Sequence, residues 1–324
     1  MTSWLPRRSK IWNTRTDLIT EQEDQKKNEK TYEIDGISVT KSLMNGTYYT
    51  IRFEDLSNVL ERKNLIHALT KTFSELFQQL NLSFESSCLV VGLGNRESTP
   101  DSLGPIVLQN LIVTKYLFDQ NTITMLDKYR NVSSFAPNVT GVTGLETIEL
   151  IKSVITTFHP DFVIAIDALA SSKIENILKV IQITDTGIHP GSGVGNNRGE
   201  LSSNTLGIPV IAVGVPTVID GVTIVYDTIR YLYQKISYTK KNFKKEKLSL
   251  FSNSHHKYQD ELSEDEKSKL LGSVGTLTEG DLKQLLKEVL VDENLIVSPK
   301  EIDFDISKLG NILSDALNKS LHRL

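Results

Sequence analysis

Two kinds of hydrophobic pattern alternate along the chain. Residues 88–93, 162–166 and 209–213 are short, nearly continuous apolar runs, which are typical of strands buried on both faces of a sheet. Residues 62–80 instead repeat apolar positions every three or four residues, which predicts an amphipathic helix. The alternation of such strands and helices predicts an α/β fold, in which a mostly parallel sheet is sandwiched by helices.

The rest of the pattern extends this prediction. Thr143 and Glu146 have the spacing of a capping box, which predicts the start of a helix that Pro160 ends. Further helices are predicted at residues 104–117, 143–159, 222–236, 279–290 and 305–321. Further strands are predicted at residues 180–184 and, on a weaker pattern, at residues 122–126.

The N-terminal region has a different character. Residues 21–30 are rich in Glu, Gln, Asp and Lys and lack aliphatic side chains, so we expect a solvated arm there. Residues 31–56 contain stretches that alternate apolar and polar positions on either side of Asn45 and Gly46, a pair that favours a hairpin turn. The region therefore predicts a small N-terminal β element before the first long helix.

Composition narrows the classes to which the chain can belong. Its 324 residues include 39% hydrophobic and 23% charged side chains, as in ordinary globular proteins. Cys88 is the only cysteine, which excludes an intramolecular disulfide and a cysteine-rich zinc site. The net charge of −4 gives no basic excess for nucleic acid, and no apolar run reaches the length of a membrane span or a signal peptide. We therefore expect a cytoplasmic protein.

Acidic side chains follow two of the predicted strands. Asp101 lies in the segment after residues 88–93, and Asp167 comes directly after residues 162–166. Ligands of parallel α/β sheets bind beyond the carboxyl ends of the strands, so we expect both acids at one edge. Two adjacent carboxylates favour a shared proton, which supplies an acid and a base for adding water to a carbonyl. The structural alternatives are a helix N-cap for Asp101 and a strand-end turn for Asp167.

Three other features suggest chemistry but fit it poorly. Asp185, Thr186 and Gly187 spell the triplet of pepsin-like proteases, which are all-β and need two such triplets, so we interpret it as a strand-to-loop turn. Ser192 lacks the glycine two residues earlier that a nucleophile elbow requires. Cys88 lies within an apolar strand, where a free cysteine is ordinarily part of the core.

A long glycine-rich stretch follows the strand at residues 180–184. Residues 187–204 show no periodicity, and loops of this length inside a domain are usually functional. With Asp101 and Asp167, His189 could complete a site for a divalent transition metal, since such ions take mixed oxygen and nitrogen ligands. The alternative is that His189 only organises the loop through hydrogen bonds.

Several ordered segments resemble a known family. They include Thr-Pro-Asp-Ser-Leu-Gly-Pro around Asp101 and Ile-Asp-Ala-Leu-Ala around Asp167. The complete set comprises residues 92–95, 99–105, 160–170, 185–196 and 205–217. In this order they resemble the germination proteases of spore-forming bacteria, densely over residues 88–229 and more loosely toward both ends.

This resemblance implies an aspartic-type endopeptidase that begins the degradation of small acid-soluble spore proteins when a spore germinates. It implies a phosphorylase/hydrolase-like fold, similar to that of hydrogenase maturation proteases. The two family aspartates that carry the assignment correspond to Asp101 and Asp167 in this sequence. Candidates for loop or oxyanion support are Asn95, His189, Gly191 and Gly193.

The resemblance also implies partners and processing. It implies small acid-soluble spore proteins as substrate, a homotetramer in the cytoplasm of the forespore or spore core, and no cofactor, bound metal, membrane or direct nucleic-acid partner. Members of the family are zymogens that remove their own N-terminal segment, at an acidic residue followed by an aliphatic one. Asp17 and Leu18 fit this pattern, so we expect self-cleavage between them.

These observations predict five regions and leave two other functions open. The regions are a propeptide at residues 1–17, an arm, hairpin and helix at 18–86, a catalytic core at 87–238, a charged insert at 239–272 and a C-terminal helical segment packing on the core at 273–324. One alternative function is a metal-dependent maturation-type peptidase that uses both acids with His189. The other is a non-enzymatic protein whose glycine-rich loop binds an anion or a peptide.

Overall fold

The chain divides into two compact units. The computed structural model describes residues 18, 21, 28–119, 126–190, 199–242, 261–289 and 295–324. The larger unit comprises Arg15–Ile219 and Ser298–Leu324, and the smaller one comprises Met1–Thr14 and Asp220–Val297. Both predicted catalytic aspartates belong to the larger unit.

The larger unit is built on a sheet with the strand order β1-β2-β3-β7-β8-β6-β4-β5. β8, β6, β4 and β5 pair in parallel, as the alternation of strands and helices predicts. The strands are β1 (Asn28–Ile34), β2 (Ile37–Leu43), β3 (Thr47–Arg52), β4 (Cys88–Gly92), β5 (Val132–Phe135), β6 (Phe162–Ser171), β7 (Val180–Thr184) and β8 (Val210–Asp220). The prediction of an α/β fold is confirmed.

The N-terminal strands form the antiparallel part of the same sheet. β1, β2 and β3 pair in sequence order, and β3 then pairs with β7, which pairs with β8. The turn between β2 and β3 contains Asn45 and Gly46, as predicted, and Met44 N donates to the carbonyl oxygen of Gly46 at 2.9 Å. Asp35 and Gly36, at φ 51° and 80°, make the turn between β1 and β2. The predicted N-terminal β element thus continues the main sheet, and β7 joins it in antiparallel rather than parallel fashion.

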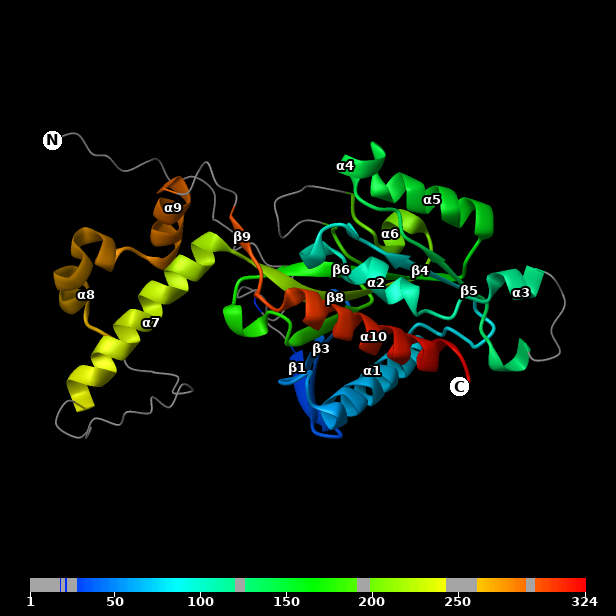
Figure 1. Cartoon of the computed structure of the whole chain (residues 1–324), viewed down its shortest axis with the longest axis horizontal. Coiled ribbons are helices and arrows are strands. Elements are labelled where there is room, and N and C mark those ends of the chain that lie inside the picture. Colours follow the sequence, from blue (N-terminus) through cyan, green and yellow to red (C-terminus); the bar gives the residue numbers. More distant parts are fainter. Residues whose placement is uncertain are drawn as a thin grey trace. The chain divides into compact units, whose positions relative to one another are not determined.

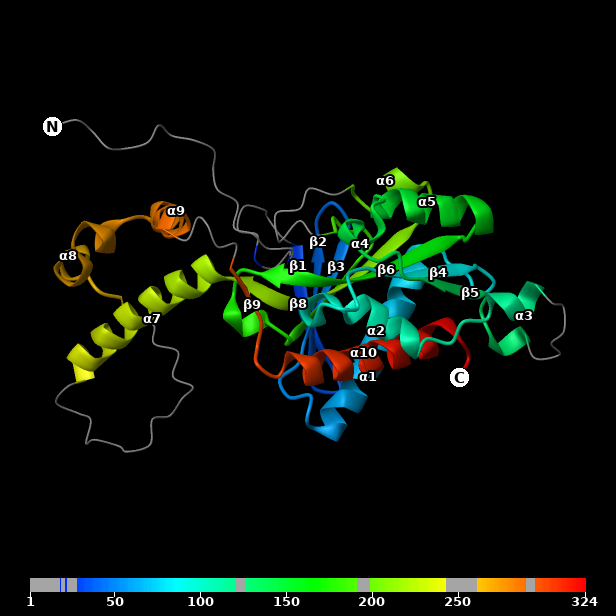
Figure 2. The ribbon, with the colours of Figure 1, turned by 45° about the horizontal axis from the view of Figure 1, so that its top comes forward.

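Helices cover both faces of this sheet, as Figures 1 and 2 show. One face carries α1 (Val59–Gln79), α2 (Leu103–Gln109) and α10 (Ile302–Leu321). The other face carries α5 (Thr147–Phe158) and α6 (Ser203–Leu206). α10 contacts both α1 and α2, so the C-terminal end of the chain completes the helical layer on its face.

The smaller unit is mainly helical. It contains α7 (Gly221–Asn242), α8 (Glu264–Leu271), the 3-10 turn η6 (Gly272–Thr276), α9 (Glu279–Val289) and the short β9 (Ile296–Val297). α7 and α9 contact each other, and the ammonium of Lys283 lies 4.6 Å from the ring centroid of Tyr226. The helices predicted at residues 222–236 and 279–290 are present, with α7 extending six residues further.

The helix predicted at residues 104–117 is interrupted. α2 ends before this range does, and α3 (Lys115–Asp119) is a separate helix. Between them, Ile112 N donates to Asn318 Oδ1 at 2.8 Å, and Thr114 N donates to the carbonyl oxygen of Val132 at 2.9 Å. Hydrogen bonds to α10 and β5 thus replace the helical ones.

The capping box predicted from Thr143 and Glu146 does not form. Thr143 is the last residue of α4 (Thr140–Thr143), and its hydroxyl accepts from Leu145 N at 3.2 Å. Glu146 occupies the N-cap position of α5 without a side-chain cap hydrogen bond. The predicted end of this helix is confirmed, because α5 stops at Phe158, ahead of Pro160.

Two further segments depart from the predicted pattern. Of the strand predicted at residues 122–126, residues 122–125 lie outside the described residues, and Leu126 begins the 3-10 turn η3 (Leu126–Lys128). β5 lies beyond it, where the sequence Val-Ser-Ser-Phe is too short and too polar to predict a strand. The prediction of a solvated arm at residues 21–30 is also wrong in part, because Glu21 is buried and Asn28 begins β1.

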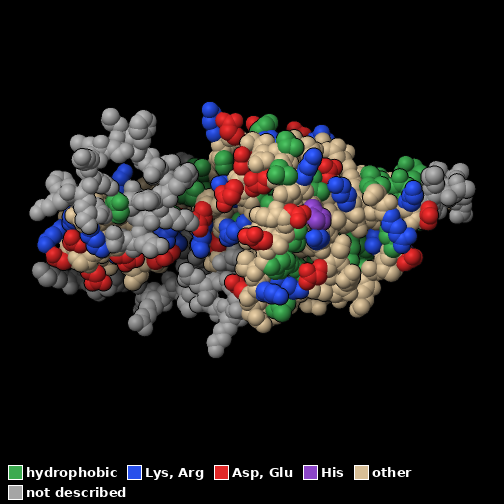
Figure 3. Space-filling model, turned by 90° about the horizontal axis from the view of Figure 1, so that it is seen from below, with side chains coloured by type: hydrophobic (Ala, Val, Ile, Leu, Met, Phe, Trp, Pro, Cys, Tyr) green, Lys and Arg blue, Asp and Glu red, His purple; other side chains and the backbone are tan. Residues whose placement is uncertain are grey.

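The surface shows no concentration of one charge on the face seen in Figure 3. Acidic and basic side chains are interspersed there among polar and apolar ones. Among the described residues, no helix combines the length and the apolar character needed to cross a bilayer.

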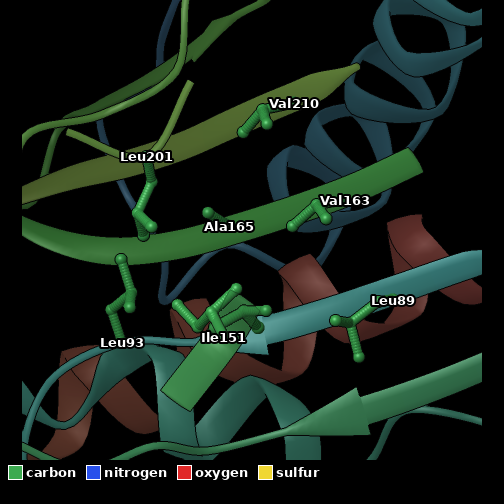
Figure 4. Close-up of a cluster of buried hydrophobic side chains, with 8 residues drawn as sticks. Leu89, Leu93, Ile151, Val163, Ala165, Leu201 and Val210 are labelled. Atoms are coloured by element: carbon green, nitrogen blue, oxygen red, sulfur yellow. The ribbon is translucent and has the colours of Figure 1, made fainter. Parts of the chain in front are cut away.

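A hydrophobic cluster fixes the strands that lead to the candidate site. Leu89 and Leu93 come from β4 and the residue after it, and they pack with Ile151 of α5. The other members of this cluster are Val91, Val163, Ala165, Leu201 and Val210, and all of them except Val91 are labelled in Figure 4. Because these side chains are almost fully buried, they hold α5 against the parallel strands and give the strand ends a firm base.

Candidate active site

Asp101 lies in a closed loop between β4 and α2. The loop ends in a 3-10 turn, η2 (Thr99–Asp101), which leads directly into α2. The N–H of Asn95 donates to the carbonyl oxygen and to the carboxylate Oδ2 of Asp101, at 3.0 and 2.9 Å. Asp101 N donates to the carbonyl oxygen of Ser98 at 2.8 Å. The loop backbone thus holds a half-buried carboxylate, and the N-cap of α2 is Ser102 rather than Asp101.

Glycines allow this loop to close against the end of β4. Gly94 has φ +99°, and a Cβ at this position would lie 2.0 Å from the carbonyl oxygen of Asp101. A Cβ on Gly104, in the first turn of α2, would lie 2.4 Å from the carbonyl oxygen of Leu93. Any side chain at either position would push α2 and η2 away from the strand. The glycine pattern here therefore serves close backbone packing around Asp101.

Asp167 lies within β6 rather than after it. The strand was predicted to end at residue 166, but β6 continues to Ser171 because β8 pairs with it along this length. Asp167 faces Gly214 of β8 in the register and is 4% exposed. Its Oδ1 accepts from Ala168 N at 2.9 Å.

Two contacts connect the Asp101 loop with β6, the strand of Asp167, and a third connects it with the neighbouring strand β8. Leu93 N donates to the carbonyl oxygen of Ile166, the residue before Asp167, at 2.8 Å. η2 itself contacts β6. The Thr217 hydroxyl of β8 donates to the carbonyl oxygen of Pro100, the residue before Asp101, at 2.7 Å. The structure therefore places both aspartates at the same end of neighbouring strands.

Of the other predicted site residues, the structure describes Asn95, His189 and Leu18. Asn95 touches Asp101 through its backbone, and its side-chain Oδ1 accepts from Glu97 N at 3.0 Å. His189 is exposed in the segment after β7. Gly191 and Gly193 lie outside the described residues, as does Asp17. Within the described part of the chain, no three acidic, histidine or cysteine side chains gather to hold a metal ion.

The pepsin-like triplet, residues 185–187, connects two neighbouring strands through side-chain hydrogen bonds. The Oδ1 of Asp185 accepts from Thr47 N at 2.8 Å, and the Thr186 hydroxyl donates to the Tyr48 hydroxyl at 2.9 Å. Both contacts join the end of β7 to the start of β3, as expected for a strand-to-loop turn. Cys88 is buried, and this burial raises the pKa of its thiol, which therefore stays protonated.

Leu18, on the carboxyl side of the predicted cleavage site, lies in the core. It is fully buried and packs with Leu169 of β6 and Val180 of β7, with Ile188 beside them. Leu169 is two residues from Asp167, so both side chains point to the same face of β6. The chain at Leu18 thus lies on the strand that carries Asp167.

Glu21 is bound in a polar pocket that the sequence did not predict. Its Oε2 accepts from the N–H and the hydroxyl of Ser172, at 2.6 and 2.7 Å. Its Oε1 accepts from the Ser171 hydroxyl at 2.5 Å and from the Nδ2 of Asn176. Arg52 donates to Asn176 Oδ1 at 2.8 Å, which orients this amide so that its Nδ2 faces Glu21.

The packing of Leu18 and the hydrogen bonds of Glu21 anchor the N-terminal segment at two points. Glu21 is 7% exposed, and its partners Ser171 and Asn176 are more deeply buried. Burying a carboxylate is costly unless hydrogen bonds replace its hydration, and four donors do so here. No local pattern around Glu21 signals this contact, because its donors come from the end of β6 and the turn after it.

The sequence of this chain is similar to those of known germination proteases. A family model described as germination protease (Peptidase_A25) matches residues 12–324. The germination protease of Bacillus subtilis (strain 168) is 41% identical over 287 residues, covering 86% of this chain and 78% of that protein. Those of Bacillus mycoides and Halalkalibacterium halodurans are 41% and 39% identical, and each match covers 96% of this chain and 94% of the relative.

One solved structure shows a distant likeness. It is a [NiFe] hydrogenase maturation protease, HycI, from Thermococcus kodakarensis KOD1, which is 18% identical to this chain. The match covers 45% of this chain and 80% of HycI, with a TM-score of 0.29. A likeness this distant says nothing about chemistry or metal binding in this chain.

Proposed function

Because this chain belongs to the germination protease family, a family of aspartic-type peptidases, we propose that it starts the degradation of small acid-soluble spore proteins during germination. The observation that carries the proposal is the placement of the Asp101 loop against β6, which carries Asp167. Two carboxylates at one sheet edge provide the acid and the base that peptide hydrolysis by water needs. With these substrates, the proposed location of the enzyme is the forespore and the spore core.

The proposed mechanism uses the aspartates as a pair with one shared proton. The ionised carboxylate removes a proton from a water molecule, whose oxygen attacks the carbonyl carbon of the peptide bond. The other carboxyl donates its proton to the leaving nitrogen as the C–N bond breaks. The products are a carboxylic acid and an amine, and the pair has exchanged its roles, so a proton transfer between the two groups resets the site.

Self-processing between Asp17 and Leu18 is part of the proposal. The burial of Leu18 beside Leu169 and the binding of Glu21 by Ser171, Ser172 and Asn176 support it, because they hold the chain near β6. A segment docked in this way reaches the site of its own chain without a bimolecular encounter. Cleavage would release residues 1–17 and leave Leu18 as the new N-terminus.

A homotetramer is the proposed assembly. Large apolar side chains of the smaller unit are exposed on α7 and α8, among them Tyr231, Leu232 and Leu270 at 42%, 51% and 46%. Exposed apolar side chains of this size favour protein contacts. Light scattering on the purified chain should give four times the monomer mass of 36.3 kDa. A monomer mass over the same concentration range would contradict this assembly.

Cleavage of the natural substrate class tests the function. The purified full chain is incubated with a small acid-soluble spore protein, and the fragments are identified by mass. We expect few cuts, each between an acidic residue and an aliphatic one. An intact substrate, under conditions in which the Bacillus subtilis relative cuts the same preparation, would contradict the proposal.

The N-terminus of the matured chain tests the processing site. N-terminal sequencing should find Leu18 as the first residue. A matured chain that begins elsewhere would overturn the assignment of Asp17 and Leu18 without affecting the activity on spore proteins.

A further inference from the structure

β8 carries one residue more than β6 where the two strands run past Asp167. The register pairs Leu169 with Pro216 and then Ala170 with Val218, so Thr217 is left over as a bulge. Bulges are uncommon between parallel strands, and they re-aim a side chain or end a pairing near functional sites. Pro216 is consistent with this irregularity, because a proline has no N–H to give to the ladder.

The bulge turns the Thr217 side chain toward the Asp101 loop. Its hydroxyl donates to the carbonyl oxygen of Pro100 at 2.7 Å, in the turn that ends with Asp101. Thr217 is 1% exposed, so bulk water does not compete for this hydrogen bond. The bond therefore holds a backbone group of η2 directly to the sheet.

This bond connects the two aspartates through the sheet. Asp167 faces Gly214 in the register of β6 and β8, and Thr217 follows three residues later on the same strand. The hydrogen bonds that Asn95 and Ser98 make with Asp101 close the loop on itself. The hydrogen bond of Thr217 instead holds this loop to β8, which pairs with β6, the strand of Asp167. It therefore affects the distance between the two carboxylates.

We propose that Thr217 is a positioning residue of the peptidase, whose hydroxyl holds the η2 turn so that Asp101 keeps its productive distance from Asp167. The inference rests on the proposed catalytic role of this pair. Thr217 has no part in the proton transfers themselves. Its loss should therefore lower kcat and leave substrate binding nearly unchanged.

Three substitutions in the full chain test this role. Thr217→Val removes the hydroxyl and keeps the shape, Thr217→Ser keeps the hydroxyl, and Thr50→Val is the matched control. Thr50 is also 1% exposed, and its hydroxyl has no hydrogen-bond partner within the described part of the chain. kcat and KM are measured on a peptide from an acid-soluble spore protein, and the thermal midpoint of each variant is recorded.

We expect Thr217→Val to lower kcat about tenfold, the effect of one lost hydrogen bond, with KM within about twofold of the parental value. Thr217→Ser should restore kcat to within about threefold, and Thr50→Val should match the parental chain. If Thr217→Val does not fold, a Thr217→Ser variant with the parental kcat still supports the role of the hydroxyl. A folded Thr217→Val with the parental kcat, or a Thr217→Ser as slow as the valine variant, overturns it.

Asp101→Asn, run in parallel, separates the two proposals. If Asp101→Asn is inactive and Thr217→Val is fully active, the positioning role fails and the catalytic pair stands. If Asp101→Asn keeps the parental activity, the catalytic pair fails, and Thr217 has no catalytic group to position.

Discussion

His322, at the C-terminal end of α10, depends on its neutral form for its hydrogen bonds. Its Nδ1 accepts from Arg130 N at 3.2 Å, and its Nε2 donates to the carbonyl oxygen of Ile112 at 3.0 Å. Burial lowers the pKa of His322 below its ordinary value of 6.5. The unfolded chain therefore takes up a proton first as the pH falls, and the folded state loses stability below about pH 6.5.

We predict that the His322→Gln variant is less stable than the parental chain at neutral pH, and that this difference in stability becomes smaller as the pH falls. At pH 7.5 the variant should be about 1–2 kcal/mol less stable, because one buried hydrogen bond is lost. Between pH 7.5 and 5.5 the difference in thermal midpoint should shrink, since only the parental chain has this histidine to protonate. A difference that stays constant over this range would show that His322 does not contribute in its neutral form.

Glu21 illustrates a single side chain that holds a whole segment. We predict that Glu21→Ala slows the cleavage between Asp17 and Leu18 at least about tenfold, because four donors lose their carboxylate acceptor and the segment leaves β6. Gel analysis of the full chain over time gives the rate. Glu33→Ala, at an exposed position of β1, is the control and should process at the parental rate. Equal rates for both variants would contradict the proposed docking.

At the scale of elements, the site depends on how closely α2 approaches the end of β4. Gly104 lies against Leu93, and Gly92 lies against Gly104 in turn, where a Cβ would come within 2.6 Å of its carbonyl carbon. The two elements meet backbone to backbone, and the loop between them carries Asp101. The spacing of a strand and a helix thus sets the position of a carboxylate.

We predict that Gly104→Ala destabilises the protein by about 1–3 kcal/mol, because the new methyl group overpacks this contact. Its activity should fall further than the loss of folded protein explains, since the displaced α2 carries η2 with it. Gly141→Ala in α4 is the control, because a Cβ there meets nothing within 4 Å. Urea unfolding and cleavage assays on both variants check this, and a Gly104→Ala variant as stable as the control would contradict it.

The elements that the sequence predicted best are those with complete local patterns. The parallel strands β4, β6 and β8 begin as continuous apolar runs, and α1, α7 and α10 carry their apolar stripes over many turns. The ends of the strands are harder to predict from the sequence, because β6 and β8 continue past residues 166 and 213 through pairing with each other. The break between α2 and α3 likewise depends on hydrogen bonds to residues far along the chain, which no local pattern contains.

At the scale of the whole molecule, one sheet collects segments that lie far apart in the sequence. Leu18, the Asp101 loop, the end of β6 and Thr217 all meet around the strands β6 and β8. The sequence predicted the edge where the acids lie, because strand topology alone determines it. It did not predict the Glu21 pocket or the role of Thr217, since both arise from tertiary contacts and not from a motif. The proline before Thr217 was the one local sign of an irregular strand.

The most direct test of the proposed aspartate pair is the activity of two asparagine variants. Asp101→Asn and Asp167→Asn are prepared as full chains, shown to be folded by their thermal midpoints, and incubated with an acid-soluble spore protein. We expect a loss of at least about a thousandfold in cleavage rate for each variant, because each removes one member of the acid–base pair. We also expect that neither variant processes its own N-terminus. A folded variant of either kind that cuts the substrate near the parental rate would contradict catalysis by Asp101 and Asp167.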